Sequence, residues 1–470
     1  MVFSSLVFLC IFLPAVFLLY SAIPNLKVRN GLLIVASLVF YAYGEPVYVL
    51  LMLFSSVLNY LCARFVRAGR HGRSRTALVI AVAVNLGILA AFKYTGFFVS
   101  SLNSVFSLSI PVPQIALPVG ISFFTFQALS YVIDVYRGDV AVQKNYFNVL
   151  LYISFFPQLI AGPIVKYHDI AQQIENRSQD IDKIARGLRR FICGLAKKVL
   201  IANTMGQTAD VIFSADPGAL ALPTAWLGAI AYLFQIYYDF SGYSDMAIGL
   251  GLMFGFTFKE NFMYPYGSVG IKDFWRRWHI SLGSFFRDYL YIPLGGNRRH
   301  QAFNILLVWF LTGMWHGASW NFIIWGIYFG FIVTVEKYTI LRIRQHIPSP
   351  LLHLYSLTLV IVGWGIFYFD DSSKMVHFFE ICFGQGAVFH DYITISALAD
   401  NCWLWVTCLL FCMPLRNRIE TLLKEYTNNR GTIQESLLLM GRLTLSILLI
   451  VLSVALLVGD TIDAFIYTRF

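Results

Sequence analysis

The sequence contains little charge, and this shortage excludes most soluble classes of protein. Only 13% of its 470 residues are Asp, Glu, Lys or Arg, whereas 58% are apolar. A soluble globular chain is about half apolar and about a quarter charged, so this chain does not cover itself with water-compatible surface. At about 20 residues per crossing, its length has room for about ten membrane spans. The composition therefore predicts an all-α, polytopic membrane protein.

Several catalytic and cofactor motifs are also missing. The chain contains no H-E-x-x-H zinc motif and no G-x-x-x-x-G-K-[ST] phosphate loop. No histidine is followed five positions later by Asp, which excludes the box of soluble-type acyltransferases. The seven cysteines include no C-x-x-C pair and mostly lie in apolar runs, so we expect buried free thiols. We expect no metal site and no bound cofactor.

Basic residues are in excess, with a net charge of +10, and they are unevenly distributed. Clusters of Lys and Arg occur at residues 64–75, 183–198, 259–299, 337–344 and 416–424. The positive-inside rule places such loops in the cytoplasm and the N-terminus outside. The asymmetry explains the positive charge without a nucleic-acid partner.

Three segments define the expected membrane topology. Residues 3–19 form an apolar run without a preceding basic residue, which indicates a permanent first span instead of a cleaved signal peptide. Residues 32–61, broken at 44–46, form either two spans or a re-entrant hairpin. Residues 145–166 have basic residues at both ends, so a re-entrant helix pair is predicted. No repeat or long linker divides residues 1–470, which we interpret as a single membrane-embedded domain.

The apolar stretch 305–335 has His316 near its centre, between two glycines that allow close helix packing or a break. His316 is 16 residues from His300 and 20 from Glu336, so at about 1.5 Å per helical residue it lies deep in the membrane. A histidine satisfied by a neighbouring helix is one interpretation. The other is a functional site, because a buried imidazole stays neutral and suits a general base.

Residues 272–291 have the periodicity of one amphipathic helix. Aromatic residues and Leu282 fall on one face, and Arg276 and Arg277 fall on the opposite face. The pattern predicts a helix at the cytoplasmic interface, anchored by Trp. His279 lies at the edge of the apolar face, where it is either incidental or functional.

Two carboxylates, Asp239 and Asp245, lie inside the apolar run 225–254. An unpaired charge in mid-membrane costs about 2.5–3.5 kcal/mol, so both need partners. They are six residues apart and do not share a helix face. The spacing therefore favours an orienting hydrogen-bond network over a catalytic carboxylate dyad.

Two short motifs, Arg276-Arg277-Trp278-His279 and Met314-Trp315-His316-Gly317, resemble in this order the membrane-bound O-acyltransferase family. Further stretches are similar to its bacterial alginate O-acetyltransferase branch, namely residues 1–5, 155–163, 237–251, 291–298 and 465–467. The resemblance covers essentially the whole chain. It assigns the invariant family histidine to His316 and the second active-site position to His279.

The resemblance implies roughly ten or more transmembrane helices, with re-entrant and interfacial helices, around a central tunnel in the bacterial inner membrane. It also implies transfer of an acyl group, acetyl in this branch, from acetyl-CoA or an acyl-carrier thioester in the cytoplasm. The acceptor is an extracytoplasmic polysaccharide, reached directly or through an exported acetyltransferase partner. In this scheme Arg276 and Arg277 are candidates for binding the donor. The candidates for orienting the catalytic groups or lining the substrate path are Asp239, Asp245, Trp315 and Asn321.

Other functions remain open at this point. The teichoic-acid D-alanylation branch has the same histidine pair but takes its acyl group from a carrier protein. A transporter or flippase would also explain Asp239, Asp245 and His316 within the membrane. A scaffolding subunit would leave these buried polar groups unexplained.

Overall fold

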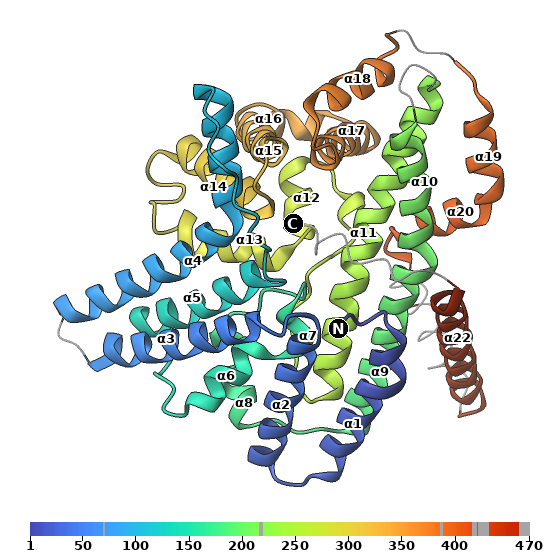
Figure 1. The fold of residues 1–470 in the computed structure, drawn as a ribbon. Helices are drawn as coiled ribbons and strands as arrows, with labels where there is room; N and C mark the ends of the chain where they lie inside the picture. The colour runs from blue at the N-terminus through green and yellow to red at the C-terminus, as the bar shows by residue number, and fades with distance from the viewer. Residues whose placement is uncertain (69–70, 216–219, 386–388, 416–420, 422–431, 460–470) are drawn as a thin grey trace.

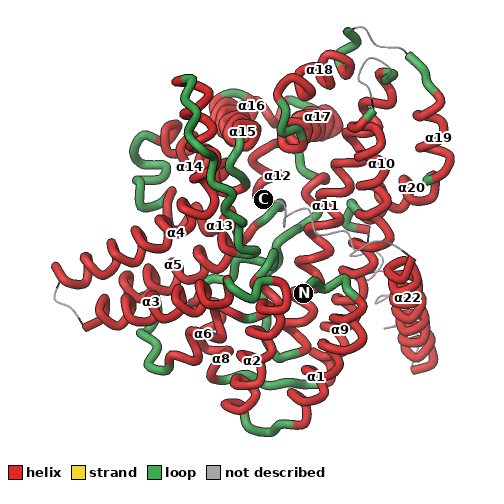
Figure 2. Tube along the Cα trace, viewed as in Figure 1, coloured by secondary structure: helices red, strands yellow, loops and turns green. Residues whose placement is uncertain are grey.

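The computed structural model describes residues 1–68, 71–215, 220–385, 389–415, 421 and 432–459. These residues form helices joined by loops, and no β-strand occurs among them (Figure 2). Arg70, most of the basic cluster 416–424 and the closing stretch 465–467 lie outside the described residues. The α-helices are α1 (Leu13–Ala22), α2 (Leu26–Gly44), α3 (Tyr48–Ala68), α4 (His71–Phe106), α5 (Ile121–Arg137), α6 (Tyr146–Ser154), α7 (Phe156–Leu159), α8 (Tyr167–Glu175), α9 (Ile181–Ala196), α10 (Asn203–Ser214), α11 (Leu222–Met253), α12 (Ile271–Arg277), α13 (Ile280–Phe286), α14 (Gln301–His316), α15 (Trp320–Tyr338), α16 (Ile340–Ile343), α17 (Ser349–Tyr368), α18 (Ser372–Cys382), α19 (Tyr392–Asp400), α20 (Cys402–Phe411) and α22 (Thr432–Gly459). Short π- and 3₁₀-helices are η1 (Phe8–Phe12), η2 (Lys197–Ala202), η4 (Pro265–Gly267), η5 (Arg287–Tyr291) and η6 (Arg344–His346).

Long apolar helices support a membrane location. Five described helices are long and apolar enough to cross a bilayer, or six if the bent pair α19–α20 is one span. They comprise Leu26–Gly44, Tyr48–Val66, Ser74–Phe106, Ser349–Tyr368 and Ser436–Gly459. This number is smaller than the ten or so spans that the chain length allows. Much of the remaining apolar sequence forms helices that are too short or not apolar enough to count as a span. The helix α14 has only 16 residues, and α11 carries two aspartates.

The N-terminal helices fold back on one another, and α3, α4 and α5 lie side by side (Figure 1). The run 3–19 is helical only over Phe8–Ala22, which is shorter than the roughly 20 residues of a full span. Helices α2 and α3 are two separate candidate spans, so the re-entrant alternative for residues 32–61 is not needed. The N-terminal ammonium donates to Phe40 O over 3.3 Å, so Met1 and the basic Lys27 lie at opposite ends of α2.

Residues 145–166 fold back within the protein. Helices α6 and α7 are separated by Phe155, and the chain then continues in irregular backbone to α8. The hydroxyl of Tyr152 donates to Val165 O over 2.8 Å, so the two arms of the segment lie together. The fold-back that the flanking basic residues predict is therefore present. Burial in protein allows this irregular backbone.

The most extensive contact between described helices joins α9 and α11, and α11 runs through the middle of the molecule (Figure 1). Two pairs of glycines bring the helix backbones together, Gly194 with Gly242 and Gly187 with Gly249. A Cβ on Gly194 would lie 2.5 Å from Gly242 O, and a Cβ on Gly249 would lie 2.6 Å from Gly187 O. Close approach of this kind is how helices pack inside membranes, where burial of apolar surface supplies little driving force.

We expect Gly194→Ala to destabilise the protein by about 1–3 kcal/mol, because the new methyl group overpacks a backbone contact. Gly31→Ala in α2 is the matched control, since a Cβ there meets no atom within 4 Å. That change should be neutral or slightly stabilising, because alanine is the better helix former. Thermal unfolding in detergent measures both variants. Equal melting temperatures for the two would contradict the tight α9–α11 contact.

Candidate active site

His316 ends helix α14 and lies at the tip of a helical hairpin. Helices α14 and α15 are antiparallel and are joined by residues 317–319. They approach closely at Gly313 and Gly326, where a Cβ on Gly313 would lie 2.3 Å from Phe322 O. The break and the close packing predicted from the glycines are both present. His316 is the last of the 16 residues of α14 and lies about 22 Å along the helix from its first residue.

Aromatic rings surround His316, which is 4% exposed. Its ring centroid lies 5.0 Å from Trp325 and 5.3 Å from Phe367. The indole of Trp315 lies 5.0 Å from His316 and 5.9 Å from His279. The structure therefore brings both predicted histidines against the same indole ring, although they come from segments 37 positions apart.

Two neighbouring residues of α4 hold the last turn of α14. The Nζ atom of Lys93 donates to Trp315 O and, over 3.1 Å, to His316 O. The hydroxyl of Tyr94 donates to Met314 O. The last carbonyls of a helix have no intrahelical donor, so these bonds satisfy groups that the fold would otherwise leave open. They also fix the backbone that carries the His316 ring.

A cavity of about 30 Å³ reaches His316. Lys93, Trp315 and His316 form one part of its wall, and the segment from Leu117 to Phe123 forms much of the rest. Residues 117–120 end the loop that runs back from the end of α4, and residues 121–123 begin α5 (Figure 2). A volume of this size has room for about two or three water molecules. The His316 ring is thus buried in protein and lines this cavity.

His279 lies at a break between two helices, which corrects the single amphipathic helix expected over 272–291. Helix α12 ends at Arg277, Trp278 is extended, and His279 is left-handed, with φ 43° and ψ 53°. For a residue other than glycine, a left-handed backbone conformation costs about 1–3 kcal/mol, and such residues often lie at functional sites. The apolar face is not interfacial either, because Phe274 and Trp278 are buried in the core. His279 is 2% exposed and lies inside the protein.

Asn261 holds His279 in place, although no motif in the sequence distinguishes it. Its Oδ1 atom accepts from Ser281 N at 3.1 Å and from Ser281 Oγ at 2.8 Å, and lies 3.2 Å from His279 Nδ1. Its Nδ2 atom donates to Ser244 Oγ over 3.0 Å. The amide orientation follows from these bonds, so the histidine contributes Nδ1–H and presents an unprotonated Nε2.

Asp239 and Asp245 pair with the helix that packs against α11. Asp239 forms an ion pair with Lys198 over 2.6 Å, and both side chains are buried. Asp245 pairs with Arg190 at 2.9 Å and with Lys197 at 2.7 Å. The two carboxylates have different partners, in line with their different helix faces. They form an ion-pair network between α11 and the α9–η2 segment instead of a dyad.

The remaining predicted residues take different positions. Arg276 is exposed, and Arg277 Nε donates to Asp273 over 3.1 Å. Asn321 is 3% exposed near the start of α15, and its Nδ2 atom donates to Phe367 O over 3.2 Å. The ring of Phe367 packs on His316, so Asn321 fixes part of the aromatic surroundings of that histidine.

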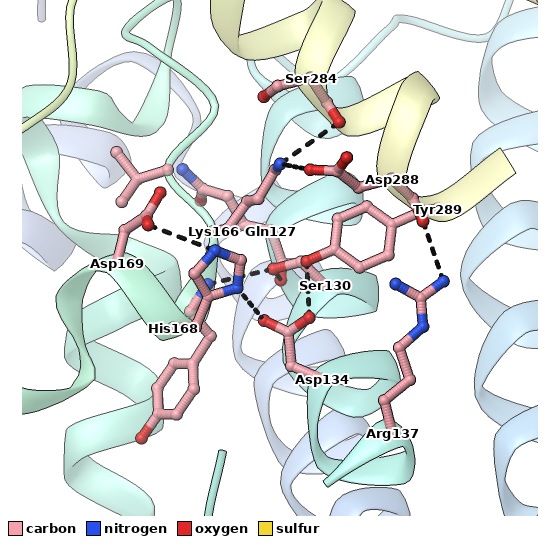
Figure 3. A network of polar contacts seen from close by, with 12 residues as sticks. Gln127, Ser130, Asp134, Arg137, Lys166, His168, Asp169, Ser284, Asp288 and Tyr289 are labelled. Carbon is pink, nitrogen blue, oxygen red and sulfur yellow. Dashed lines mark hydrogen bonds and ion pairs between the residues drawn. The ribbon is translucent and has the colours of Figure 1, made fainter. Parts of the chain in front are cut away.

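A second polar network lies near the other end of α5 (Figure 3). Asp134 is 1% exposed and contacts His168 Nδ1 at 2.9 Å and the Tyr289 hydroxyl at 2.7 Å. Lys166 pairs with Asp288 in the same group. These contacts tie α5 to η5 and to the start of α8. The sequence gives no spacing signal for the network, because its members come from three distant segments.

Comparison with known proteins identifies the family. Residues 140–371 match the model of the membrane-bound O-acyltransferase family. The chain is 46% identical over 400 residues to the probable alginate O-acetylase AlgI of Azotobacter vinelandii, covering 82% of this chain and 79% of that protein. The corresponding protein of Pseudomonas aeruginosa is 44% identical over 82% of this chain and 75% of its own length. The peptidoglycan O-acetyltransferase of Helicobacter pylori is 36% identical over 78% of this chain and 77% of its own.

The chain belongs to the membrane-bound O-acyltransferase family. It is therefore an acyltransferase and a membrane protein, as the two histidine motifs indicate. The matched region, residues 140–371, includes His279, His316 and Asn261. Lys93 and Tyr94 lie before it, although they contact the same turn of α14.

All seven cysteines are free thiols, and four of them are buried. Within the part of the chain that the structure describes, no three His, Cys, Asp or Glu residues are grouped so that they could hold a metal ion. The buried cysteines fill space in the core, as expected from their apolar neighbours in the sequence.

Proposed function

We propose that the protein transfers an acetyl group from a cytoplasmic thioester to a hydroxyl group of an extracytoplasmic polysaccharide, directly or through an exported acetyltransferase partner. The observation that carries this proposal is the position of His316, buried among aromatic rings and open to a cavity. The names of the relatives, alginate O-acetylase and peptidoglycan O-acetyltransferase, support both the acyl group and the polymeric acceptor. The donor is acetyl-CoA or an acyl-carrier thioester.

In the proposed reaction His316 is the general base. It takes the proton of the acceptor hydroxyl while the oxygen attacks the thioester carbonyl. The new C–O bond forms, the C–S bond breaks, and the proton passes to the leaving thiolate, so an ester and a free thiol result. Apolar surroundings keep water from hydrolysing the thioester and strengthen each electrostatic contact.

His279 supports His316 in this scheme. The Asn261 contacts leave Nε2 of His279 unprotonated. This nitrogen can accept a hydrogen bond that fixes the tautomer of His316, whereas it cannot donate one to the thioester carbonyl. Trp315 packs on both imidazoles and fixes their positions relative to each other. Asn321 orients the rings around His316 through Phe367.

Charged residues around this centre have supporting roles. Arg276 and Arg277 contact the anionic part of the donor. Asp239 and Asp245 act at a greater distance, by fixing α11 against α9–η2.

We also propose that the protein lies in the bacterial inner membrane with its N-terminus outside. The basic loop after α3 and the start of α2 carry the Lys and Arg expected in the cytoplasm. Met1 lies at the other end of α2, which supports an outer position for the N-terminus.

Thiol release tests the function directly. The purified full-length protein, supplied with an acetyl thioester, should release free thiol only when a polysaccharide or a partner hydroxyl is present. A thiol reagent measures the rate, and mass spectrometry detects the acetylated product. A transporter would move its substrate without releasing thiol, so acceptor-independent or absent thiol release would overturn the proposal.

A further inference from the structure

The proposed reaction needs a hydrogen-bond donor that the residues assigned to it so far do not supply. When the acceptor oxygen attacks the thioester, negative charge develops on the carbonyl oxygen, and enzymes that transfer acyl groups stabilise this charge with positioned donors. His316 is assigned to the acceptor hydroxyl. Nε2 of His279 is unprotonated and can only accept a hydrogen bond. The donor for the carbonyl oxygen must therefore come from another residue of the site.

Trp315 has a buried hydrogen-bond donor without an acceptor. The residue is 5% exposed, and its Nε1–H has no hydrogen-bond partner in the described part of the chain. An indole N–H can only donate, and a buried one usually has a partner. Because an unpaired buried donor is costly, a group that binds at this site is its expected acceptor.

The position of Trp315 suits a carbonyl oxygen beside His316. Both residues line the cavity of about 30 Å³, and the indole also packs on His279. Room for about two or three water molecules is comparable to the size of an acetyl group. The cavity wall includes Gly120 to Phe123 at the start of α5, and the N-terminus of a helix favours negative charge. The site therefore fits a small carbonyl group whose oxygen becomes negative.

We propose that Trp315 is a catalytic residue whose indole N–H donates a hydrogen bond to the carbonyl oxygen of the thioester as that oxygen becomes negative. The inference rests on the proposed function, since the thioester is taken to react beside His316. The indole loses no proton. The C–O bond forms and the C–S bond breaks as in the proposed reaction, and the hydrogen bond strengthens while the charge is on the oxygen. Trp315 therefore has a second role besides holding the two imidazoles.

An isosteric replacement separates the N–H of Trp315 from its ring. In the full chain in detergent, Trp315 is replaced by benzothienylalanine, which has nearly the shape of tryptophan but carries sulfur in place of the N–H. We expect kcat for acceptor-dependent thiol release to fall about 10²–10³-fold, the usual effect of removing one oxyanion donor, while KM for the thioester stays within about twofold. Trp315→Phe removes the same donor and should lose at least as much, so it replaces the isostere if that variant does not fold.

The same isostere at Trp325 is the matched control. Trp325 is buried, packs on His316 and has an indole N–H without an acceptor among the described residues, but it does not line the cavity. This variant should keep at least about a third of the parent kcat, because its N–H does not reach the reacting carbonyl.

A second control addresses the other side-chain donors in the cavity wall. Lys93 Nζ already donates to Trp315 O and His316 O, which leaves the hydroxyl of Ser122 as the rival donor. Ser122→Ala should keep the parent kcat. A loss in this variant with none at Trp315 would assign the donor to the hydroxyl and overturn the inference.

The parent protein separates this inference from the proposed function. If the parent releases thiol with an acceptor and the Trp315 isostere keeps its kcat, the acyl transfer stands and the role of the indole N–H is wrong. Equal losses at Trp315 and Trp325 would also overturn the inference alone, because they would reflect packing around His316. A parent protein that releases no thiol with any acceptor would overturn the acyl transfer and this inference together.

Discussion

Replacing His316 with alanine is expected to lower acyl transfer by about 10²–10⁴-fold, the usual contribution of a positioned general base. The imidazole is the group that removes the proton from the acceptor hydroxyl, and alanine has nothing to replace it. The protein should still fold and insert, because the hairpin contact at Gly313 and Gly326 does not depend on this ring. The measurements are acceptor-dependent thiol release and acetylation of the polymer in cells.

His377→Ala serves as the control for this change. That histidine is half-exposed in α18, where it pairs with Glu380 over 3.0 Å. The control should keep full activity and show that loss of a histidine is not in itself harmful. Retention of more than about a tenth of the activity in the His316 variant would remove it from the role of general base.

The position of His316 could be predicted from the sequence because three independent signals agree. A long apolar stretch, two glycines and a histidine near the centre are enough to predict a break deep in the membrane. The structure adds what spacing cannot give, namely the aromatic neighbours and the cavity. These depend on α5 and α17, which no local pattern connects with α14.

The break at His279 could not be predicted, because the apolar period continues across it. Trp275, Trp278 and Leu282 keep a helical spacing, so the pattern indicates one continuous helix. In the structure, tertiary hydrogen bonds replace the helical ones at this point. The amide of Ile280 donates to Asn261 O over 3.0 Å, and other bonds hold the next residue to the Asn261 side chain. Contacts with a distant residue therefore override the local preference.

Lys93 was missed for a similar reason. Lys93 is the last basic residue before a stretch without Lys or Arg that extends to Arg137. In the sequence it therefore counts only as a marker of membrane topology. Its bonds to the end of α14 cross more than 220 positions. The requirement that Asp239 and Asp245 find partners was predictable from their cost in the membrane, whereas the identity of those partners was not.

Removing the positive charge of Lys198 is expected to destabilise the protein by about 3–5 kcal/mol, because Lys198→Met leaves Asp239 charged and buried. Both side chains are at most 5% exposed, so water cannot replace the lost partner. Lys197→Met is the matched control on the next residue. Asp245 keeps Arg190 when Lys197 is removed and is partly exposed, so this variant should be much less affected. Thermal unfolding and the yield of folded protein in detergent measure the difference.

The double variant Lys198→Met with Asp239→Leu separates a structural pair from a functional one. Replacing a buried ion pair by apolar residues of similar size is often neutral or stabilising, so stability should return to about that of the parent. Acyl transfer should return with it, since Asp239 is assigned to the contact between α11 and η2 and not to the reaction. A double variant that is stable but inactive would instead place Asp239 on the substrate path. Equal stability of the Lys198 and Lys197 single variants would show that the Asp239 pair is not the buried, dry contact described here.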